Sequence, residues 1–269
     1  MKESHAICRV IVNVSRVLAV TLALQMGRSL TVVGAEVSPR SSNGKGGAVG
    51  TFPDEKIDID GQTREYRLVV PNSVDGSKSV PILFAFHGFL IDNKDLMAAY
   101  SQLDKLAEKE GFVLVFPNGQ DKAWKLIPAL AKNDFAFFDQ LLAHLSEKYN
   151  LDKNRVYLCG MSNGAYFSHL LASQRSDVVA AIGCHSGGLG MLSRREPSVK
   201  HKYGVFIVHG EDDSIVKVDE GRRARDAYKK WGFPHEYLEV PNHNHFWASK
   251  ADVNTKMWKF MMAHPLDAK

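Results

Sequence analysis

The sequence predicts an α/β domain with a mostly parallel central sheet and helices on both faces. From residue 80 onward, short β-branched and aromatic runs alternate with longer segments whose apolar residues recur at helical spacing. Strands and helices that alternate in this way form parallel sheets covered by helices. The composition agrees, because 45% hydrophobic and 24% charged residues are typical of a soluble globular protein, and 269 residues allow one large α/β domain or two small ones.

The first 35 residues have the pattern of a secretory signal peptide. Lys2, Arg9 and Arg16 precede an apolar run from Val17 to Met26, and small residues at 33–35 offer a cleavage position. The apolar run is shorter than the roughly 20 residues that span a bilayer. We therefore expect a cleaved leader and a secreted or periplasmic protein, with a retained anchor as the alternative.

Removal of this leader would leave a nearly neutral chain. Four of the 34 basic residues and one of the 30 acidic residues lie within it, so 30 basic and 29 acidic residues would remain. The basic character of the chain owes much to the leader. We therefore expect neither nucleic-acid binding nor stable association with a membrane after cleavage.

Residues 36–50 are expected to be a flexible linker, because the stretch from Ser38 to Gly50 has no hydrophobic periodicity. Its Gly-Lys-Gly-Gly sequence is not a phosphate loop, since no Ser or Thr follows the lysine and no strand precedes it. Residues 51–269 are then one domain without repeats. It begins with a hairpin, in which Ile57–Ile59 and Arg64–Val70 flank the turn Asp60-Gly61.

The alternating part of the domain contains six expected strands and five expected helices. The strands are Val80–Phe86, Phe112–Phe116, Val156–Cys159, Val178–Cys184, Tyr203–His209 and His235–Val240. The helices are one from Leu96 to Ala107 that Gly111 ends, a stripe from Phe135 to Leu145 that starts near Asn133-Asp134, and the segments Ala165–Leu171, Arg222–Trp231 and Asp252–Met262.

The stretch Gly160-Met161-Ser162-Asn163-Gly164 stands between an expected strand and an expected helix. A G-x-S-x-G sequence in that context presents its serine on a sharp turn. Such a turn strains the backbone, so the positions two residues before and after the serine need to be nearly free of side chain. The following helix directs its positive end at an oxygen that gains charge in a reaction. We therefore expect Ser162 to be a nucleophile; a plain glycine-rich loop is the alternative.

Ligands of parallel sheets bind beyond the carboxyl ends of the strands. The segments that follow the six central strands there are His87-Gly88-Phe89, Pro117-Asn118-Gly119, Ser162, Cys184-His185-Ser186-Gly187, His209–Asp213 and Pro241–Trp247. Reactive residues thus come in the order serine, acid, histidine. That order is typical of α/β-hydrolases and differs from the orders in chymotrypsin and subtilisin.

The chain resembles the secreted esterases of the α/β-hydrolase superfamily that include polyhydroxybutyrate depolymerases and feruloyl esterases. The resemblance rests on PILFAFHGF, the segment ending NDFAFF, DKNRVYLCGMSNGAYFSHLLA, VFIVHGEDDSIVKV and the late HFW. These stretches cover nearly the whole domain and are specific for the fold and the reaction class. Relatives often carry more glycine after the His-Gly pair, where this chain has Phe89-Leu90, which puts any substrate taken from the family in doubt.

The resemblance implies a Ser-His-Asp triad. Ser162 attacks the ester carbonyl while a base takes its proton. In the family the base stands two positions before a tryptophan, which matches His245, with His243 as the rival. The acid that orients the imidazole matches Asp213, three positions after Gly210, with Asp212 and Glu211 as the adjacent alternatives.

An oxyanion needs two N–H donors in place before the reaction. Asn163, which follows the nucleophile, is expected to provide one, and Phe89 the other through its backbone. His87 is expected to brace the turn after the first central strand. The residues expected beside the substrate are His87, Gly88, Trp124 and Trp247. With Phe89, the two tryptophans could form a flat apolar wall for an aromatic acyl group; ordinary packing is the alternative.

Cys159 and Cys184 are the cysteines that would remain after loss of the leader. Both end neighbouring expected strands. We expect buried free thiols, because strand-packed cysteines behave as small hydrophobes, with a disulfide as the alternative in an oxidising compartment. His243-x-His245 lacks further placed ligands, so no metal site is expected, and no diffusible cofactor is implied.

These observations predict an exported α/β-hydrolase, without a large lid domain, that cleaves carboxylic esters through an acyl-enzyme intermediate. The expected substrates are small soluble or polysaccharide-linked esters with feruloyl, acetyl or other short acyl groups, because only Met191–Lys202 separates the fourth and fifth central strands beyond a Gly-Gly turn, and no second module follows that could hold a solid substrate. The alternatives are a polyhydroxyalkanoate depolymerase, a peptidase-like enzyme with the same triad, and a carbohydrate-binding module with a vestigial triad.

Overall fold

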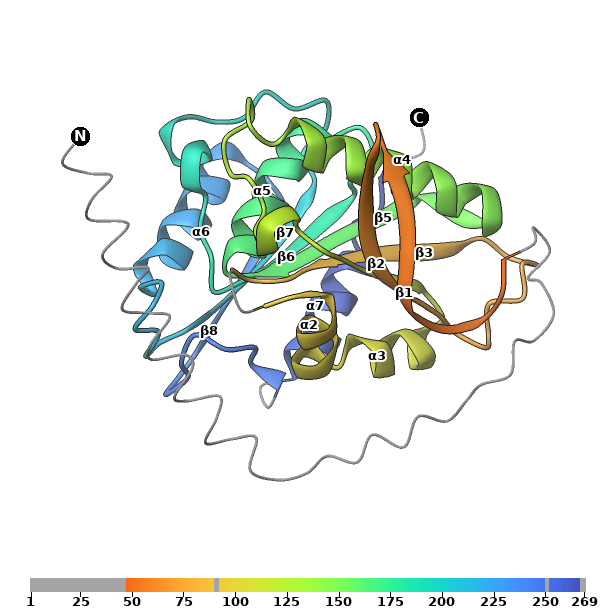
Figure 1. Ribbon diagram of the computed structural model, residues 1–269. Coiled ribbons are helices and arrows are strands. Elements are labelled where there is room, and N and C mark those ends of the chain that lie inside the picture. Colours follow the sequence, from red (N-terminus) through yellow and green to blue (C-terminus); the bar gives the residue numbers. More distant parts are fainter. Residues whose placement is uncertain (1–46, 90–91, 250–251, 267–269) are drawn as a thin grey trace. The chain divides into compact units, whose positions relative to one another are not determined.

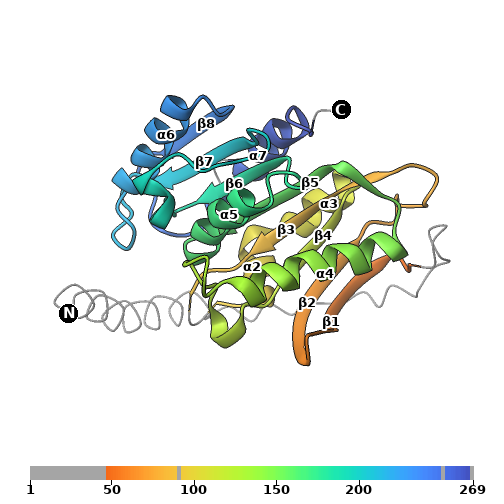
Figure 2. The same ribbon diagram turned by 90° about the horizontal axis from the view of Figure 1, so that it is seen from above.

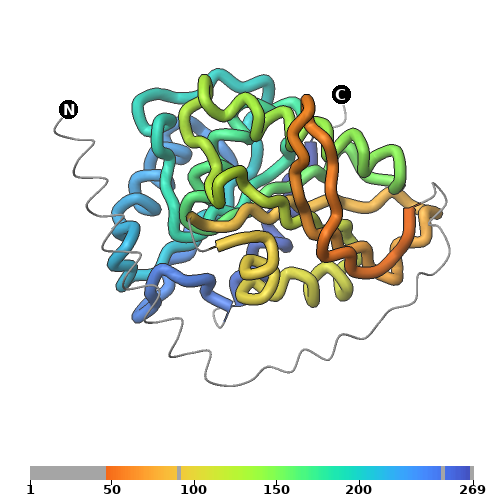
Figure 3. The backbone as a smooth tube through the Cα atoms, viewed as in Figure 1, coloured from red at the N-terminus to blue at the C-terminus, as the bar shows by residue number. Residues whose placement is uncertain are grey.

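The computed structural model describes residues 47–89, 92–249 and 252–266. The predicted signal peptide and most of the predicted linker lie outside them. The strands are β1 (Gly50–Ile59), β2 (Gln62–Val70), β3 (Val80–Phe86), β4 (Val113–Pro117), β5 (Leu151–Met161), β6 (Ala181–His185), β7 (Gly204–Gly210) and β8 (His235–Val240). They form one eight-stranded sheet in the order β1-β2-β4-β3-β5-β6-β7-β8, and Figure 3 traces the chain from the hairpin at one edge to β8 at the other.

The helices are α2 (Lys94–Ser101), α3 (Leu103–Glu110), α4 (Lys132–Lys148), α5 (Asn163–Gln174), α6 (Asp219–Trp231) and α7 (Val253–Met262), with short 3-10 helices η1 (Gln120–Lys122) and η2 (Gly190–Arg194). Figures 1 and 2 show α4, α5 and α6 on one face of the sheet and α2, α3 and α7 on the other. The predicted α/β class is confirmed. None of the helices in the described ranges has the length and apolar character needed to cross a membrane.

The six strands from β3 to β8 all run parallel to their neighbours in this group. Their side chains alternate between the two faces, as the pleat requires. Ile82, Phe84 and Phe86 belong to the core under α4, α5 and α6, whereas Leu83 and Ala85 belong to the core under α2, α3 and α7. Burial on both faces explains why these strands are continuously apolar. Parallel direction brings their carboxyl ends to one edge of the sheet.

The predicted hairpin is confirmed. β1 and β2 pair antiparallel from Ile59 opposite Gln62 to Gly50 opposite Val70. The two turn residues, Asp60 and Gly61, have φ angles of 51° and 82°. Positive φ at both positions is what a type I′ hairpin turn requires, and Asp-Gly tolerates it. β2 then pairs antiparallel with β4 and attaches the hairpin to the parallel part of the sheet.

The body of the domain begins before residue 51. The Gly47 N–H donates to the Lys148 carbonyl at 3.1 Å, and the Tyr149 hydroxyl donates to the Ala48 carbonyl at 2.8 Å. Val49 is buried in the core. The last four residues of the expected linker are therefore packed against the C-terminal end of α4, a long-range contact that local composition does not report.

The expected single helix from Leu96 to Ala107 is wrong, because the segment forms two helices. Gln102 ends α2 and begins α3 with φ 52° and ψ 30°, a left-handed conformation that no α-helix contains. The break changes which residues face the core: Met97 and Ala98 are buried on α2, whereas Ala99 is exposed. The expected end of the segment is confirmed, since Gly111 caps α3 with φ 73°.

Candidate active site

Ser162 occupies a sharp turn between β5 and α5, as the G-x-S-x-G pattern predicts. Its φ and ψ angles are 54° and −116°, a strained conformation for a residue with a side chain. A Cβ atom on Gly160 would lie 2.4 Å from the Gly164 backbone, and one on Gly164 would lie 2.1 Å from the Phe86 carbonyl oxygen. Only glycine fits at both positions. The turn is also anchored to β6, because the Ser162 N–H donates to the His185 carbonyl at 2.9 Å.

The Ser162 side chain is partly exposed and makes no capping hydrogen bond to α5. It stands at the edge where the parallel strands end, between the loops that follow β3 and β6. The hydroxyl is therefore not committed to stabilising the helix on which it stands.

Asp213 and His245 are brought together from the loops after β7 and β8. The His245 Nδ1 lies 2.7 Å from Asp213 Oδ2, and both side chains are buried. The other carboxylate oxygen, Oδ1, accepts the backbone N–H groups of Ile215 and Val216 at 2.9 Å each. An ionised carboxylate only accepts, so Nδ1 carries the proton and Nε2 of His245 keeps a free lone pair.

The environment keeps Asp213 ionised. Burial alone would raise the pKa of this carboxyl, but hydrogen bonds from His209, His245 and the Val216 N–H hold the pKa well below its usual range. A buried negative charge beside Nδ1 stabilises a proton that arrives on the imidazole.

The rival residues have other contacts. Asp212 and Glu211 are exposed, and the His243 Nε2 lies 2.7 Å from the Phe246 carbonyl. A carbonyl accepts only, so this nitrogen donates and is not free to take a proton. Of the acids and histidines that the sequence left open, the structure joins Asp213 with His245.

The turn after β3 is braced from inside the protein. The Gly119 N–H donates to His87 Nε2 at 2.9 Å, so Nδ1 carries the proton and donates to the Gly88 carbonyl at 2.7 Å. Burial lowers the pKa of His87, which keeps the imidazole neutral. The Gly88 N–H donates to Asp92 Oδ2 at 2.7 Å. His87 braces this turn, and its side chain is completely buried. Gly88 is buried as well, so neither residue presents a surface to a substrate, contrary to the expectation.

The two tryptophans that were expected to form an aromatic wall for the substrate are buried. Trp124 is only 2% exposed; its ring stacks on Phe167, and its Nε1 donates to the His87 carbonyl at 3.1 Å. Trp247 is 5% exposed, stacks on His185 and donates through Nε1 to Asn254 at 2.8 Å. Both rings are core packing with their N–H groups satisfied, which was the alternative to a substrate contact. Phe89, at 39% exposed, is the member of the wall that faces solvent.

The Asn163 side chain ties the nucleophile turn to the loop after β4. Its Oδ1 accepts the Trp124 N–H at 2.7 Å, and its Nδ2 donates to the Trp124 carbonyl at 3.2 Å. The side chain is thus occupied by one residue of the neighbouring loop. The Asn163 backbone is at the first position of α5, where helix N–H groups have no intrahelical acceptor.

Comparison with known proteins finds similarity to esterases. The family model described as Esterase PHB depolymerase matches residues 65–198, which include Ser162. Among curated proteins, the chain is 25% identical over 206 residues to feruloyl esterase D of Neurospora crassa, covering 72% of this chain and 68% of the relative. It is 26% identical to feruloyl esterase C of Emericella nidulans, covering 59% and 58% of the two chains. The chain is similar to these esterases, and the matches identify it as a carboxylic ester hydrolase.

Solved structures show the same fold. A ferulic acid esterase superposes with a TM-score of 0.64 at 16% identity, covering 80% of this chain and 99% of that one. The ferulic acid esterase of Anaeromyces mucronatus, in complex with ferulic acid, gives 0.60 at 19% identity, with 80% and 92% covered. An S-formylglutathione hydrolase of Agrobacterium tumefaciens gives 0.63 at 12% identity, with 85% and 98% covered. At these identities the likeness shows a shared fold.

Three polar residues of this esterase site escaped prediction from the sequence. His185 accepts the Ala248 N–H on Nε2 at 2.9 Å and thereby holds the loop that carries His245. Asp92 holds the turn after β3 through the Gly88 N–H. His209 lies 3.2 Å from Asp213 through its Nε2. His185 and His209 do stand at strand ends, which was a signal for function, but their partners are distant in sequence.

Cys159 and Cys184 of the esterase are both buried and free. They lie on adjacent strands one register position apart, since Cys159 pairs with Gly183 and Gly160 pairs with Cys184. Burial raises the pKa of both thiols well above its usual range. The expectation of free thiols is confirmed.

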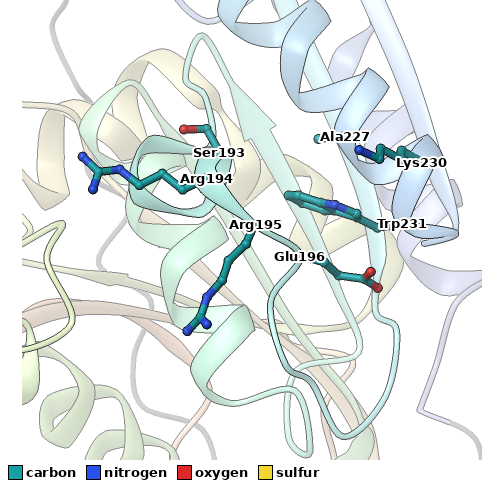
Figure 4. Close-up of a pocket in the computed structure, with 7 residues that line it drawn as sticks. All are labelled: Ser193, Arg194, Arg195, Glu196, Ala227, Lys230 and Trp231. Carbon is teal, nitrogen blue, oxygen red and sulfur yellow. The ribbon is translucent and has the colours of Figure 1, made fainter.

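A pocket of about 410 Å³ lies between η2 and α6, lined by Ser193, Arg194, Arg195, Glu196, Ala227, Lys230 and Trp231 (Figure 4). The side chains of Arg194 and Arg195 point away from Trp231 in that view. None of the residues that line it is one of the predicted site residues. This pocket is therefore separate from the Asp213–His245 pair of the esterase.

Proposed function

We propose that the protein is a secreted serine esterase with Ser162 as nucleophile, His245 as base and Asp213 as the acid that orients the base. The observation that carries the proposal is the 2.7 Å hydrogen bond between His245 Nδ1 and Asp213 Oδ2 at the sheet edge where Ser162 stands on its strained turn. The bond leaves His245 Nε2 as the free acceptor. A serine needs such a base to react near neutral pH.

In the proposed reaction, His245 Nε2 takes the Ser162 hydroxyl proton as the serine oxygen attacks the carbonyl carbon. The carbonyl π electrons move to its oxygen and form a tetrahedral oxyanion. When the C=O bond re-forms, the bond to the alcohol oxygen breaks, and that oxygen takes the proton from His245. Water then attacks the acyl-enzyme carbonyl in the same way, with His245 taking its proton, which releases the carboxylic acid and restores Ser162.

The backbone N–H groups of Asn163 and Phe89 are proposed to bind the oxyanion. Support comes from the position of Asn163 at the first turn of α5, whose N-terminal end favours negative charge. The braces on His87 and Gly88 support the other donor, because they hold the backbone that precedes Phe89. Two donors fixed in advance stabilise the charge without reorganisation during the reaction.

The proposed substrates are soluble or polysaccharide-linked esters with a feruloyl or short-chain acyl group. The relatives named for feruloyl esters support the class. The surface supports an apolar acyl group, because exposed large apolar side chains occur on the loops after β3 and β6, the two neighbours of β5, and on the loop after β4, the strand beyond β3. They are Phe89, Ile127, Leu130 and Met191. These side chains replace the buried tryptophans as the expected apolar contacts.

The first test uses Ser162→Ala, with Ser193→Ala as the matched control because Ser193 is a serine on η2 outside the proposed triad. Loss of a triad nucleophile can cost about a million-fold in kcat, so Ser162→Ala should show no turnover of a chromogenic acetyl ester while Ser193→Ala stays at the wild-type rate. A fluorophosphonate should label Ser162, located by peptide mass spectrometry. Turnover by folded Ser162→Ala above a few per cent would refute the nucleophile.

The second test concerns the substrate. Wild type, Met191→Ala and Leu130→Ala are compared on methyl ferulate, on short acyl esters and on a polyhydroxybutyrate film. Truncation of an apolar contact should lower kcat/KM for the feruloyl ester about two- to tenfold and leave the acetyl ester nearly unchanged. Rapid film degradation beside negligible turnover of the small esters would favour a polymer depolymerase instead.

Secretion is part of the proposal and rests on the pattern of residues 1–35. Mass spectrometry of the exported protein should find an N-terminus close to residue 36. A protein that keeps its first residue and sediments with membranes would favour a retained anchor.

A further inference from the structure

The Asp213 carboxylate lies between two imidazoles. Its Oδ2 is 2.7 Å from His245 Nδ1 and 3.2 Å from His209 Nε2. His209 is the penultimate residue of β7, four positions before Asp213, and is completely buried. We propose that His209 is a positioning residue of the esterase, which fixes Asp213 Oδ2 toward His245 and depends on Gly221 of α6 for its own position. The inference rests on the proposed triad and deepens it.

The hydrogen-bond partners determine the tautomer of His209. Its Nε2 also lies 2.8 Å from the Val216 carbonyl oxygen. A carbonyl and an ionised carboxylate both accept only, so Nε2 must carry the proton, which it donates to the Val216 carbonyl while lying 3.2 Å from Asp213 Oδ2. The proton therefore cannot be on Nδ1 of the neutral ring. Among the described residues Nδ1 is buried and has no hydrogen-bond partner.

Both carboxylate oxygens of Asp213 are in contact with N–H groups. Oδ1 accepts two backbone N–H groups, from Ile215 and Val216, whereas Oδ2 accepts the N–H of His245 and lies 3.2 Å from His209 Nε2. A carboxylate offers about four lone-pair positions, so four N–H groups around two oxygens leave it little freedom to turn. Three of the donors come from the β7 end and its loop, and they set the direction in which the fourth, on His245, is received.

Gly221 supplies a second observation that is independent of the hydrogen bonds. It stands in the first turn of α6, although glycine is a poor helix former. A Cβ atom at this position would lie 2.7 Å from His209 Nδ1 and 3.0 Å from His209 Cβ. The missing side chain therefore makes room for the imidazole. Helix α6 thus has an unfavourable residue at the position where it packs against the His209 ring.

The amide side chains distinguish a positioned donor from a space-filling ring. The amide nitrogen of glutamine extends to about the position of Nε2, whereas that of asparagine reaches only to the position of Nδ1. Loss of a hydrogen bond to a charged group can lower a rate about 10- to 100-fold. We therefore expect His209→Asn and His209→Leu to lower kcat about 10- to 100-fold with KM nearly unchanged, and His209→Gln to recover most of the loss.

A second experiment displaces the His209 ring without removing it. Gly221→Ala should lower kcat about tenfold, although alanine favours the helix. In a His209→Ala background the same change should have no further effect on kcat, because the ring that transmits the displacement is absent. Each variant is checked for folding by circular dichroism and thermal unfolding. If His209→Leu fails to fold, the test rests on the comparison of His209→Gln with His209→Asn and on Gly221→Ala in the two backgrounds.

Asp213→Asn and Ser162→Ala in the same ester assay separate the two proposals. If both are inactive while His209→Gln and His209→Asn have equal kcat, or while Gly221→Ala keeps the wild-type kcat, the role of His209 is refuted and the triad stands. If Asp213→Asn keeps wild-type activity, the triad itself is wrong. The expected result is inactivity of both triad variants with a clear separation of Gln from Asn at position 209.

Discussion

The two histidines of the Asn242–Phe246 segment differ in the atom that is left free. His245 directs Nδ1 to Asp213, which leaves Nε2 for the hydroxyl proton of Ser162 in the proposed reaction. His243 commits Nε2 to the Phe246 carbonyl. The same residue type, two positions apart, is therefore prepared for chemistry in one case and for holding a loop in the other.

This difference predicts opposite results for two matched substitutions. His245→Ala should lower kcat/KM for a chromogenic ester by at least about a thousandfold, because the triad acts as a unit. His243→Ala should retain most of the activity and lose some thermal stability, since one hydrogen bond of the loop disappears. Steady-state kinetics with thermal unfolding of both variants provides the measurement. An inactive His243→Ala beside an active His245→Ala would transfer the role of base to His243.

At the scale of elements, the break between α2 and α3 places a residue with a side chain in a left-handed conformation. Gln102 is exposed and has φ 52°. Gln102→Gly should raise the free energy of unfolding by about 0.5–1 kcal/mol, because glycine adopts this conformation without a steric penalty. Gln102→Ala should not. Urea denaturation of the three proteins compares them, and equal stability of the Gly and Ala variants would show that the break carries no strain.

Helix α5 also contains a buried histidine that the proposed reaction does not use. His169 is completely buried, its Nδ1 lies 2.9 Å from the Tyr228 hydroxyl, and burial lowers its pKa to about 3. In the unfolded chain a histidine titrates near 6.5. Between these two pH values the unfolded state binds a proton that the folded state does not, so acidification through this range favours unfolding.

We therefore expect the wild type to lose stability below about pH 6.5, with His169 contributing up to about 1.4 kcal/mol per pH unit. His169→Phe keeps an aromatic ring and removes the titration, so its stability should fall less steeply between pH 7 and pH 5. Urea midpoints at several pH values compare the two proteins. Parallel curves would mean that His169 does not contribute to the acid sensitivity.

At the scale of the whole molecule, the reactivity of the two free cysteines measures whether the centre of the sheet opens to solvent. Cys159 on β5 and Cys184 on β6 are buried, with helices packed on both faces of their strands. A thiol-specific reagent should leave both unmodified in native protein and modify both across the unfolding transition, as peptide mass spectrometry can follow. Reductant should not change the thermal midpoint. Labelling of either cysteine well before global unfolding would reveal a separate opening of β5 or β6.

The sheet order also explains how the three residues of the proposed triad come to the same edge of the sheet. Ser162 follows β5, which lies between β3 and β6, whereas Asp213 and His245 follow β7 and β8 farther along the same edge. Every strand that contributes is parallel to its neighbour, so every contributing loop leaves the sheet on the same side. The hairpin at the opposite edge contributes none of the proposed triad residues.

Local information in the sequence determined much of this protein. Continuous apolar runs predict strands buried on both faces, and β3 and β8 have the predicted bounds. The pattern Gly160-x-Ser162-x-Gly164 predicts the strained turn, because the room it needs is created by the absence of two nearby side chains. The order of serine, acid and histidine predicts the reaction class. Each of these signals is contained in a few neighbouring residues or in their order.

Only the tertiary structure decided the rest, because the forces responsible join residues far apart in the chain. The choice of Asp213 over Asp212 follows from a contact with a loop 32 residues away. Trp124 and Trp247 are residue types that often line binding sites. Their packing against Phe167 and His185 nevertheless places them in the core. The shape match between Gly221 and His209 exists only after α6 packs on β7. Periodicity and composition describe what a segment can do, and burial by distant partners decides what it does.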